Sequence, residues 1–426
     1  MAPAFAPGAE FAAKLDAADE LASFRRAFEL PRERRRPLVY LCGHSLGLMP
    51  RRAPSAVAAE LERWAAHGAE AHFHGKNSWL DYHERFAVPL AALVGARRDE
   101  VVAMNSLTVN LHLMLVSFFR PAGKRTKILI ERGAFPSDRY AVQSQLAHHG
   151  LDPATHLLEI GARRPASLLD LDEYEALLAA RGEEIALVLL PGVQFLTGQA
   201  LPIAELAATA RRYGCRAGFD LAHAIGNVPL ALHAAGADFA VWCSYKYLNA
   251  GPGAVGGCFV HRKWLDRADV QRFAGWWGHD KATRFAARAA HVPLAGADAW
   301  QLSNPPILAM VPLAASLDIF RRAPLRALRR KSVRLTGYLE ALLEHELADR
   351  VDLVTPRDPD ARGCQLSLRV AVEPARLGEV RRRLRAAGVV ADWRGTDILR
   401  MAPAPLYNRY RDVFAAVHAL RGALAR

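Results

Sequence analysis

The chain has 426 residues, of which 51% are hydrophobic and 23% charged, and its formal net charge is +13. This balance is typical of a globular protein and excludes a fibrous, low-complexity or intrinsically disordered chain. Because a single core stops growing at roughly 250–300 residues, the length predicts two lobes. No run of roughly 18 consecutive apolar residues occurs, so we expect no membrane partner.

The N-terminal residues, the cysteines and the net charge limit the compartment and the partners that we expect. The segment from Met1 to Phe11 lacks the basic start and long apolar stretch of a secretion signal, so we expect the cytoplasm. The five cysteines are widely spread without a C-x-x-C pair, which predicts neither a disulfide framework nor a metal site. The positive charge raises the alternative of a nucleic-acid-binding regulator. We expect no nucleic-acid partner, because the arginines follow the pattern of exposed helix faces and no segment is left for a separate binding module.

The first half of the chain has the pattern of an α/β domain. From about Val101 to Val260, apolar runs rich in β-branched residues alternate with helical patterns, which is typical of βαβ units around a mainly parallel sheet. The expected strands are Thr126–Glu131, Ile185–Leu190, Cys215–Asp220, Phe239–Ser244 and Gly257–His261, and the expected helices include Ser137–His149 and Ala204–Tyr213.

After Pro305 and Pro306 the pattern changes to that of a small α+β domain. We therefore expect an N-terminal segment at 1–60 that packs on the C-terminal domain, a large domain at 61–308 and a small domain at 309–426. The elements expected for the small domain are a long helix at Ala309–His345, short strands near Val351–Thr355, Gln365–Val370, Val389–Trp393 and Ile398–Met401, and helices at Pro374–Ala387 and Asn408–Leu424.

Two residues at strand ends point to the chemistry. In open parallel sheets, ligands bind beyond the carboxyl ends of the strands, where Asp220 ends one expected strand and Lys246 follows another. A pyridoxal phosphate (PLP) site requires both groups: the lysine forms a Schiff base with the aldehyde, and the acid keeps the ring nitrogen protonated. The alternatives are a helix cap for Asp220 and a surface lysine for Lys246. The pair together favours PLP.

Three further positions could complete such a site. A hydroxyl at the helix start near Ser106 and Thr108 could bind a phosphate, with plain N-capping as the alternative. Phe135 could lay its face on a pyridine ring, or it could be the hydrophobic staple of a helix cap. His223, three residues after Asp220, could contact the same ring or be a structural histidine.

Taken together, these strings resemble kynureninase, a PLP enzyme of fold type I, over most of the chain. The matching strings are Gly43 to Gly47, Ala134 to Asp138, Gly192 to Gln194 with Thr197 to Gln199, Phe219 to Asn227, Trp242 to Gly251, Gly275 to His279, Ser303 to Pro306, and Arg400 to Asn408. The resemblance implies a fold-type I large domain with a mainly parallel sheet and a small C-terminal α+β domain. It also implies a homodimer whose two active sites are shared between subunits.

The resemblance also implies roles for individual residues. Pro191 departs from the pattern, because some relatives carry there a serine that contacts the cofactor. The implied catalytic residues are Lys246 and Tyr245; the implied cofactor-binding residues are Leu107, Thr108, Phe135, Pro136, Ser137, Asp138, Asp220, His223, Tyr245 and Lys246, joined by Trp276 and Asn304 of the second subunit; and the implied substrate-binding residues are Arg400, His72 and Asn304.

The implied reaction is hydrolysis of L-kynurenine or its 3-hydroxy derivative to the corresponding anthranilate and L-alanine. His72 and Asn304 resemble the pair in relatives that favour the 3-hydroxy substrate, which we therefore expect to be preferred. The closest rival is another fold-type I enzyme, an aminotransferase or a cysteine desulfurase. A desulfurase needs a nucleophilic cysteine on a mobile loop, whereas Cys364 precedes an apolar stretch that looks like a strand.

Overall fold

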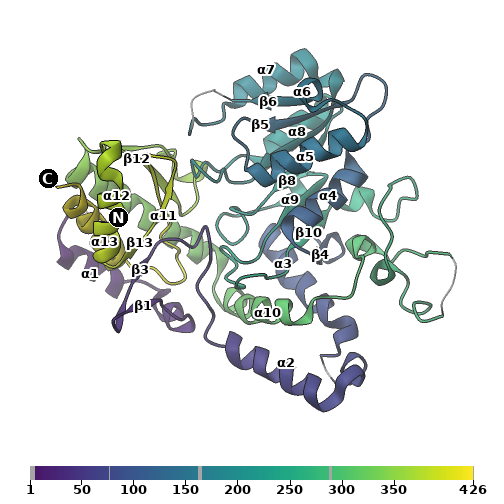
Figure 1. The fold of residues 1–426 in the computed structure, drawn as a ribbon, viewed down its shortest axis with the longest axis horizontal. Coiled ribbons are helices and arrows are strands. Elements are labelled where there is room, and N and C mark those ends of the chain that lie inside the picture. Colours follow the sequence, from purple (N-terminus) through teal and green to yellow (C-terminus); the bar gives the residue numbers. More distant parts are fainter. Residues whose placement is uncertain (1–4, 76, 162–165, 287–289, 426) are drawn as a thin grey trace.

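The structure is a computed structural model that describes residues 5–75, 77–161, 166–286 and 290–425. It contains two lobes, a larger one built on a seven-stranded sheet and a smaller one built on a four-stranded sheet (Figure 1). Among the described residues, no helix is both long and apolar enough to cross a membrane. A large α/β domain and a small α+β domain are what the sequence predicts.

The seven-stranded sheet is mainly parallel, as expected. Its order is β4-β10-β9-β8-β7-β5-β6; the strands from β9 to β6 in this order run parallel, and β10 is antiparallel to both of its neighbours. The strands are β4 Val101–Ala103, β5 Lys127–Glu131, β6 Leu157–Ile160, β7 Ile185–Pro191, β8 Arg216–Asp220, β9 Phe239–Trp242 and β10 Gly257–Val260.

A hydrophobic core lies on each face of this sheet, because successive side chains of a strand point to opposite faces. In β7, Val188 and Leu190 enter the core that contains residues of α8 and α10, whereas Leu187 and Leu189 enter the core formed with α4 and α5. The helices of this part of the chain are α2 Ala53–His67, α3 Ala87–Val94, α4 Leu107–Phe118, α5 Pro136–His148, α6 Pro153–His156, α7 Leu171–Arg181, α8 Ile203–Arg212, α9 Leu232–Ala235 and α10 Ile307–Arg322.

The small lobe is an antiparallel sheet in the order β11-β12-β15-β14, covered by three helices. Helix α13 packs against both α11 and α12. The strands are β11 Val351–Leu353, β12 Leu366–Val370, β14 Asp392–Arg394 and β15 Ile398–Met401, and the helices are α11 Leu325–Leu347, α12 Pro374–Ala386 and α13 Tyr410–Leu424.

Two predictions for this lobe are wrong. The single helix expected at Ala309–His345 is two helices, because α10 ends at Arg322 and α11 starts after Pro324, whose backbone is extended. Proline has no N–H to continue the hydrogen-bond ladder and disfavours the helical conformation of the residue before it. The single strand expected at Val389–Trp393 is also two strands, since β13 (Val389–Val390) pairs outside the sheet to which β14 belongs.

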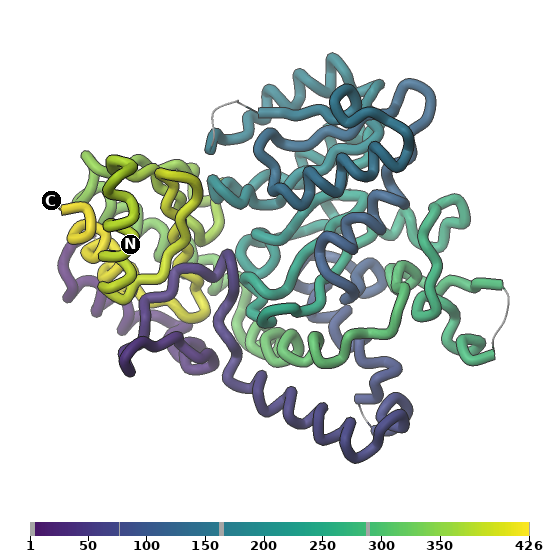
Figure 2. Tube along the Cα trace, in the orientation of Figure 1, coloured from purple at the N-terminus to yellow at the C-terminus, as the bar shows by residue number. Residues whose placement is uncertain are grey.

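The N-terminal segment lies along the small lobe (Figure 2). Its strand β3 (Val39–Tyr40) pairs in parallel with β13, and its first helix α1 (Ala9–Ala17) packs on α13. A hairpin of β1 (Arg32–Glu33) and β2 (Arg36–Pro37) precedes β3. Helix α2 then follows and packs along α10. The chain therefore passes from the small lobe to the large one before the large sheet begins.

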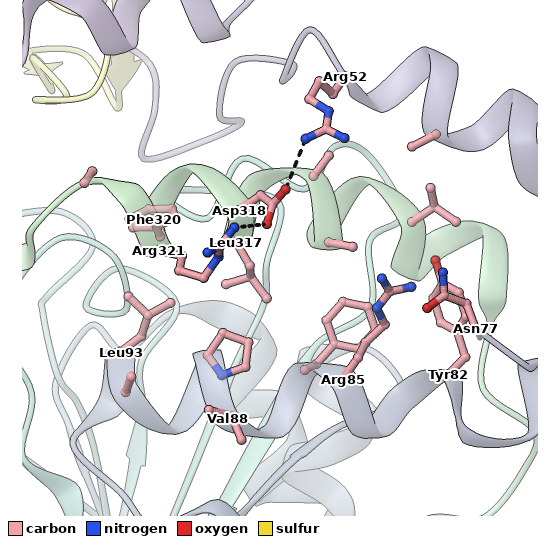
Figure 3. A pocket seen from close by; sticks show the side chains of 18 of the residues that line it. Arg52, Asn77, Tyr82, Arg85, Val88, Leu93, Leu317, Asp318, Phe320 and Arg321 are labelled. Carbon is pink, nitrogen blue, oxygen red and sulfur yellow. Dashed lines mark hydrogen bonds and ion pairs between the residues drawn. The ribbon is translucent and has the colours of Figure 1, made fainter.

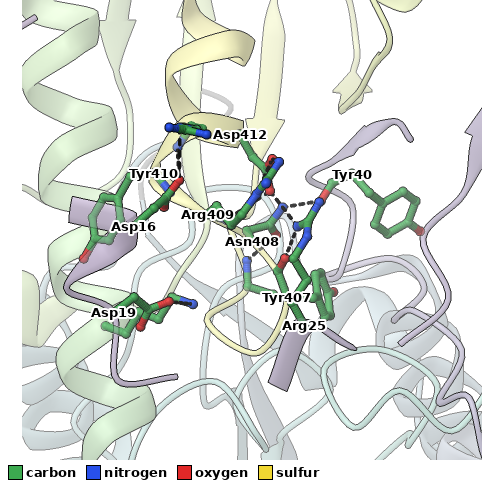
Figure 4. Close-up of polar contacts among 12 residues, drawn as sticks. Asp16, Asp19, Arg25, Tyr40, Tyr407, Asn408, Arg409, Tyr410 and Asp412 are labelled. Carbon is green, nitrogen blue, oxygen red and sulfur yellow. Dashed lines mark hydrogen bonds and ion pairs between the residues drawn. The ribbon is translucent and has the colours of Figure 1, made fainter. Parts of the chain in front are cut away.

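Polar contacts fix this segment to the end of the chain (Figure 4). The Arg25 guanidinium donates to Asp412 Oδ2 at 2.7 Å and also to the Tyr407 carbonyl oxygen. Asn408 Nδ2 donates to the Tyr40 carbonyl oxygen at 3.0 Å. Because Arg25 and Asp412 are largely buried, these charge-assisted bonds are screened less by solvent than surface pairs.

A second ion pair, between the N-terminal segment and α11, gives a test of this attachment to the small lobe. Lys331 Nζ lies 2.7 Å from Asp19 Oδ2, and each side chain is only 5% exposed. Lys331→Ala leaves the Asp19 carboxylate buried without its cation, so we expect the free energy of unfolding to fall by about 3–5 kcal/mol in urea denaturation.

The adjacent residue provides the matched control. Arg330 pairs with Glu20 at 2.7 Å, but both side chains are more than half exposed. We expect Arg330→Ala to cost less than about 1 kcal/mol. Equal losses for the two variants would show that burial of the Lys331 pair does not stabilise the attachment.

Candidate active site

Most of the predicted site residues line one small pocket at the carboxyl ends of the parallel strands. The pocket encloses about 70 Å³. Strands β5 and β8 reach it with their last residues, and the segment after β9 brings in Lys246. The lining residues are Leu107, Thr108, Glu131, Phe135, Ser137, Asp138, Pro191, Val193, Phe195, Asp220, Ala222, His223, Tyr245 and Lys246.

The starts of two helices meet at one end of this pocket. Helix α4 begins after Ser106 and α5 begins after Phe135. The hydroxyl groups of Thr108 and Ser137, in the first turns of these helices, are hydrogen-bonded at 2.7 Å. Unpaired backbone N–H groups and the helix dipole make such a junction favourable for an anion.

Aromatic rings form one side of the pocket. Phe135 is 40% exposed, and its ring meets the ring of Phe195 edge to face, with 5.3 Å between the centroids. Lys246 Nζ lies 5.8 Å from the Phe135 centroid and 5.8 Å from that of Tyr245. The amine is therefore close to a partly exposed aromatic face that a planar ligand could cover.

Three carboxyl groups are buried beside this amine. Burial raises the pKa of Asp220, an effect opposed by the positive charge of Lys246 and by the Ala222 N–H, which donates to Asp220 Oδ1 at 2.7 Å. Burial, and then the neighbouring Asp220, raise the pKa of Asp138 well above its ordinary value. Burial also raises the pKa of Glu131 to about 8, although Gln194 Nε2 donates to its Oε1 at 3.3 Å. At neutral pH, Glu131 is therefore mainly protonated.

His223 and Tyr245 are neutral in these surroundings. Burial, followed by the charge of Lys246, lowers the pKa of His223 well below its usual value. Its Nδ1 is buried without a hydrogen-bond partner among the described residues, so it is free to contact a ligand. Burial raises the pKa of the Tyr245 phenol, which keeps its proton at neutral pH.

Arg400 lies just outside the pocket and reaches it through Phe195. Its side chain is 1% exposed, and Nη1 donates to the Phe195 carbonyl oxygen at 2.5 Å. Nε donates to Asp392 Oδ2 at 2.7 Å. The guanidinium is thus held at the edge of the pocket rather than inside it.

Besides Arg400, four predicted residues do not line the pocket within one chain: Pro136, which is the first residue of α5, Trp276, His72 and Asn304. Trp276 is 47% exposed and donates its indole N–H to the Arg284 carbonyl oxygen at 2.9 Å. His72 packs its ring against Trp79, and Asn304 is exposed. That Trp276 and Asn304 act in the site of the second subunit stays a prediction.

Sequence reasoning missed several residues that bear on the site. Glu131 is the last residue of an expected strand, so the strand-end rule that selected Asp220 could also have selected it. Phe195 comes shortly after the end of β7 and has no polar side chain that the strand-end rule would select. Asp392 carries no such signal, because it belongs to the small lobe and approaches the site through Arg400.

One group elsewhere has the side chains of a metal site. Glu100, His233 and His261 place one possible ligand atom each within 4.8 Å of the others. Glu100 Oε1, however, already contacts His233 Nδ1 and accepts from the Arg262 N–H, both at 2.8 Å. His261 Nδ1 accepts from the Lys263 N–H. These hydrogen bonds account for the cluster without an ion.

Comparison with known proteins identifies the family. The chain is 53% identical over 406 residues to a kynureninase of Xanthomonas campestris pv. campestris (strain B100), covering 95% of this chain and 96% of that protein. The chain belongs to the kynureninase family. A kynureninase of Xanthomonas oryzae pv. oryzae (strain PXO99A) is 54% identical over 403 residues, covering 95% of each chain. Residues 328–420 also match the model of the kynureninase C-terminal domain.

Solved structures show how widely the fold of this kynureninase family member is shared. A cysteine desulfurase of Escherichia coli superposes with a TM-score of 0.74 at 18% identity, over 95% of this chain and 98% of that chain. A cysteine desulfurase of Thermococcus onnurineus gives 0.73 at 18% identity, over 90% and 94% of the two chains. At this identity the likeness shows the fold alone, which is that of fold-type I enzymes.

The buried Glu131 carboxyl should make the free energy of unfolding depend on pH. Its pKa is about 8 in the folded chain and about 4.5 in the unfolded chain, so the folded state holds more protons between these values and stability falls as pH rises through them. We expect Glu131→Gln to raise the free energy of unfolding by roughly 2–4 kcal/mol at pH 8.5, with little effect near pH 4.5. Urea denaturation of the protein stripped of small molecules measures both values.

Glu183→Gln is the control for this measurement, because Glu183 is exposed in the turn before β7. Its effect should stay within about 0.5 kcal/mol at both pH values. A constant difference between Glu131→Gln and the unaltered protein across this range would show that Glu131 does not titrate as described.

Proposed function

We propose that this chain binds PLP in the pocket around Lys246 and hydrolyses L-kynurenine or 3-hydroxy-L-kynurenine to the corresponding anthranilate and L-alanine. Membership of the kynureninase family over nearly the full chain supports the reaction. The observation that carries the assignment to this pocket is the placement of Asp220 and Lys246 together at the ends of neighbouring parallel strands.

The residues of the pocket fit PLP. Lys246 supplies the amine that binds the aldehyde, Asp220 the carboxylate for the ring nitrogen, and Phe135 the aromatic face against the ring. The first turns of α4 and α5, with Tyr245, supply donors for the phosphate. The unpartnered His223 Nδ1 is a further buried polar atom that a ligand would satisfy. Bound PLP supplies an electron sink for negative charge at the substrate Cα and then at Cβ.

Each protein group has a distinct task in this proposal. Lys246 Nζ takes the proton from the substrate Cα and would pass it to the bound cofactor. The Tyr245 hydroxyl keeps its proton at neutral pH and relays it while water adds to the γ-carbonyl. Arg400 binds the α-carboxylate, for which its planar fork of N–H groups is suited.

The aromatic end of the substrate is assigned to His72 and to Asn304 of the second subunit. A polar pocket that hydrogen-bonds a ring hydroxyl discriminates against a substrate that lacks it. We therefore propose 3-hydroxykynurenine as the preferred substrate. The reaction then belongs to tryptophan degradation through kynurenine, and its product can feed NAD synthesis.

The homodimer is part of this proposal. An apolar groove of about 850 Å³ runs between α2, α3 and α10, as Figure 3 shows for residues such as Val88, Leu93 and Phe320. Large apolar side chains are exposed nearby, among them Trp64 at 58% and Leu308 at 43%. Exposed apolar surface of this extent is typical of an interface.

Two further expectations stand as proposals. We place the protein in the cytoplasm, in keeping with five cysteines that are all buried and unpaired. We divide the chain at residues 60 and 308: the contacts of α1 and β3 to the small lobe support the N-terminal part of this division, whereas residue 60 lies within α2 and residue 308 within α10.

The geometry disfavours the cysteine desulfurase alternative. Cys364 has no exposed surface, and burial raises the pKa of its thiol to about 12. A thiolate nucleophile needs a lowered pKa and access to substrate. Cys364 is therefore unsuited to the role that a desulfurase requires.

Replacing the lysine tests the assignment of cofactor and reaction together. We expect purified protein to show a visible absorbance band from bound PLP and to release alanine and a fluorescent anthranilate from kynurenine. Lys246→Ala should lose the band and at least about 10³-fold in kcat, because amine and proton carrier are removed together. Lys263→Ala, a surface lysine paired with Asp238, should retain both.

Other outcomes would assign the protein differently. A protein that shows no band after incubation with PLP would contradict the cofactor assignment. A band without carbon–carbon cleavage would favour an aminotransferase. The ratio of kcat/KM for 3-hydroxykynurenine and kynurenine decides the preferred substrate.

Subunit mixing tests whether the sites are shared. We expect Trp276→Ala and Lys246→Ala to be inactive separately but to recover about a quarter of the wild-type activity when unfolded and refolded together, since half of the dimers then contain one intact site. Mixing each variant with itself is the control. An absence of recovery, with a mixed dimer confirmed by differently tagged chains, would show that Trp276 does not act across the interface.

A further inference from the structure

Arg400 is held from two sides before any substrate binds. It lies on β15, directly opposite Asp392 of β14 in the antiparallel register. Two of its nitrogens donate to the same oxygen, Asp392 Oδ2, with 2.7 Å from Nε, and Nη1 donates to the Phe195 carbonyl oxygen at 2.5 Å. A guanidinium has five N–H groups, so these contacts leave two for another partner.

Asp392 differs from an ordinary surface ion-pair residue. Its side chain is 22% exposed, whereas that of Arg400 is 1% exposed. The buried His44 ring also lies beside it, with 3.8 Å between Nε2 and Oδ2. Burial alone would raise the pKa of Asp392, but His44 and Arg400 together lower it, so the carboxylate stays charged. Burial lowers the pKa of His44 to about 4, so this ring is neutral at pH 7.

The other anchor of Arg400 belongs to the pocket wall. Phe195 lines the pocket with its ring against Phe135, while its carbonyl oxygen accepts from Arg400. The guanidinium therefore bridges the small lobe, through Asp392, and the large lobe, through Phe195. A long arginine side chain without such anchors has many rotamers, which a substrate would have to order on binding.

We propose that Asp392 is the positioning residue that fixes the Arg400 guanidinium so that its two remaining N–H groups bind the substrate α-carboxylate. This inference rests on the proposed function, in which Arg400 is the carboxylate-binding residue. Asp392 itself does not touch the substrate. It makes the arginine ready for a bidentate contact, whose strength depends on the direction of both N–H bonds.

The test compares ligands with and without the α-carboxylate. In the PLP-loaded enzyme, Asp392→Ala should raise KM for kynurenine and the inhibition constant of L-alanine roughly 10- to 100-fold, the range for loss of a hydrogen bond to a charged group. Asp392→Asn, which keeps an acceptor oxygen, should give a smaller increase. The inhibition constant of 2-aminoacetophenone, which has the aromatic ketone but no α-carboxylate, should stay unchanged, and kcat should change less than about threefold.

A matched control comes from the same hairpin. Asp397 pairs with Arg369 on the neighbouring strand, and both side chains are partly exposed. Asp397→Asn should leave KM, kcat and both inhibition constants unchanged. The absorbance of bound PLP, measured for every variant, checks that the cofactor site is intact.

A double-mutant cycle separates positioning from a general structural role. If Asp392 acts through Arg400, then Asp392→Asn should have no further effect on KM in an Arg400→Gln background. Additive effects, an unchanged or lowered KM in Asp392→Asn, or an equal loss of 2-aminoacetophenone binding would each overturn the proposal. A wild-type protein that does not cleave kynurenine, or an Arg400→Gln variant with unchanged KM, would instead overturn the proposed function.

Discussion

The burial of three carboxyl groups beside one amine is the constraint on which the site depends. Charged carboxylates are costly at low polarity, so burial raises the pKa of Asp138 and raises that of Glu131 to about 8. Lys246 and the Ala222 N–H compensate Asp220, which makes it the group best able to carry charge. The cores on both faces of the large sheet keep water from this region. Burial in this region therefore raises the pKa of all three carboxyl groups, and Lys246 opposes that rise at Asp220.

The small lobe contributes to the site by orienting Arg400 rather than by lining the pocket. Arg400 approaches from the end of an antiparallel hairpin and touches the pocket only through a backbone carbonyl. Its orientation is consequently a property of the contact between lobes, and any shift of one lobe relative to the other changes the N–H groups that a substrate meets. The N-terminal segment is fixed to the small lobe by Arg25 and Asp412, so it would move together with that lobe.

The sequence was informative where local pattern determines position. Asp220 ends one apolar strand and Lys246 follows the next, and because the ends of parallel strands meet at one edge of a sheet, both line the same pocket. The break before α11 was missed because apolar residues continue at helical spacing on both sides of Pro324. Asp392 could not be predicted, since it reaches the site from the small lobe through Arg400, and Phe195 was missed because no polar group marks it after β7. The roles of Trp276 and Asn304 still depend on a second chain.

The pairing of β3 with β13 joins residues that are about 350 positions apart, because Val39 lies opposite Val389. A ribosome makes the N-terminal segment first, and domains generally fold as they emerge. This segment, however, has its strand partner β13 and its helix partner α13 much later in the chain. Its apolar face must therefore stay without its native cover until those later residues have been made. During that interval, other contacts must shield the apolar face of the nascent chain from water. A chain that is truncated before β13 and α13 would leave this face without its native partners.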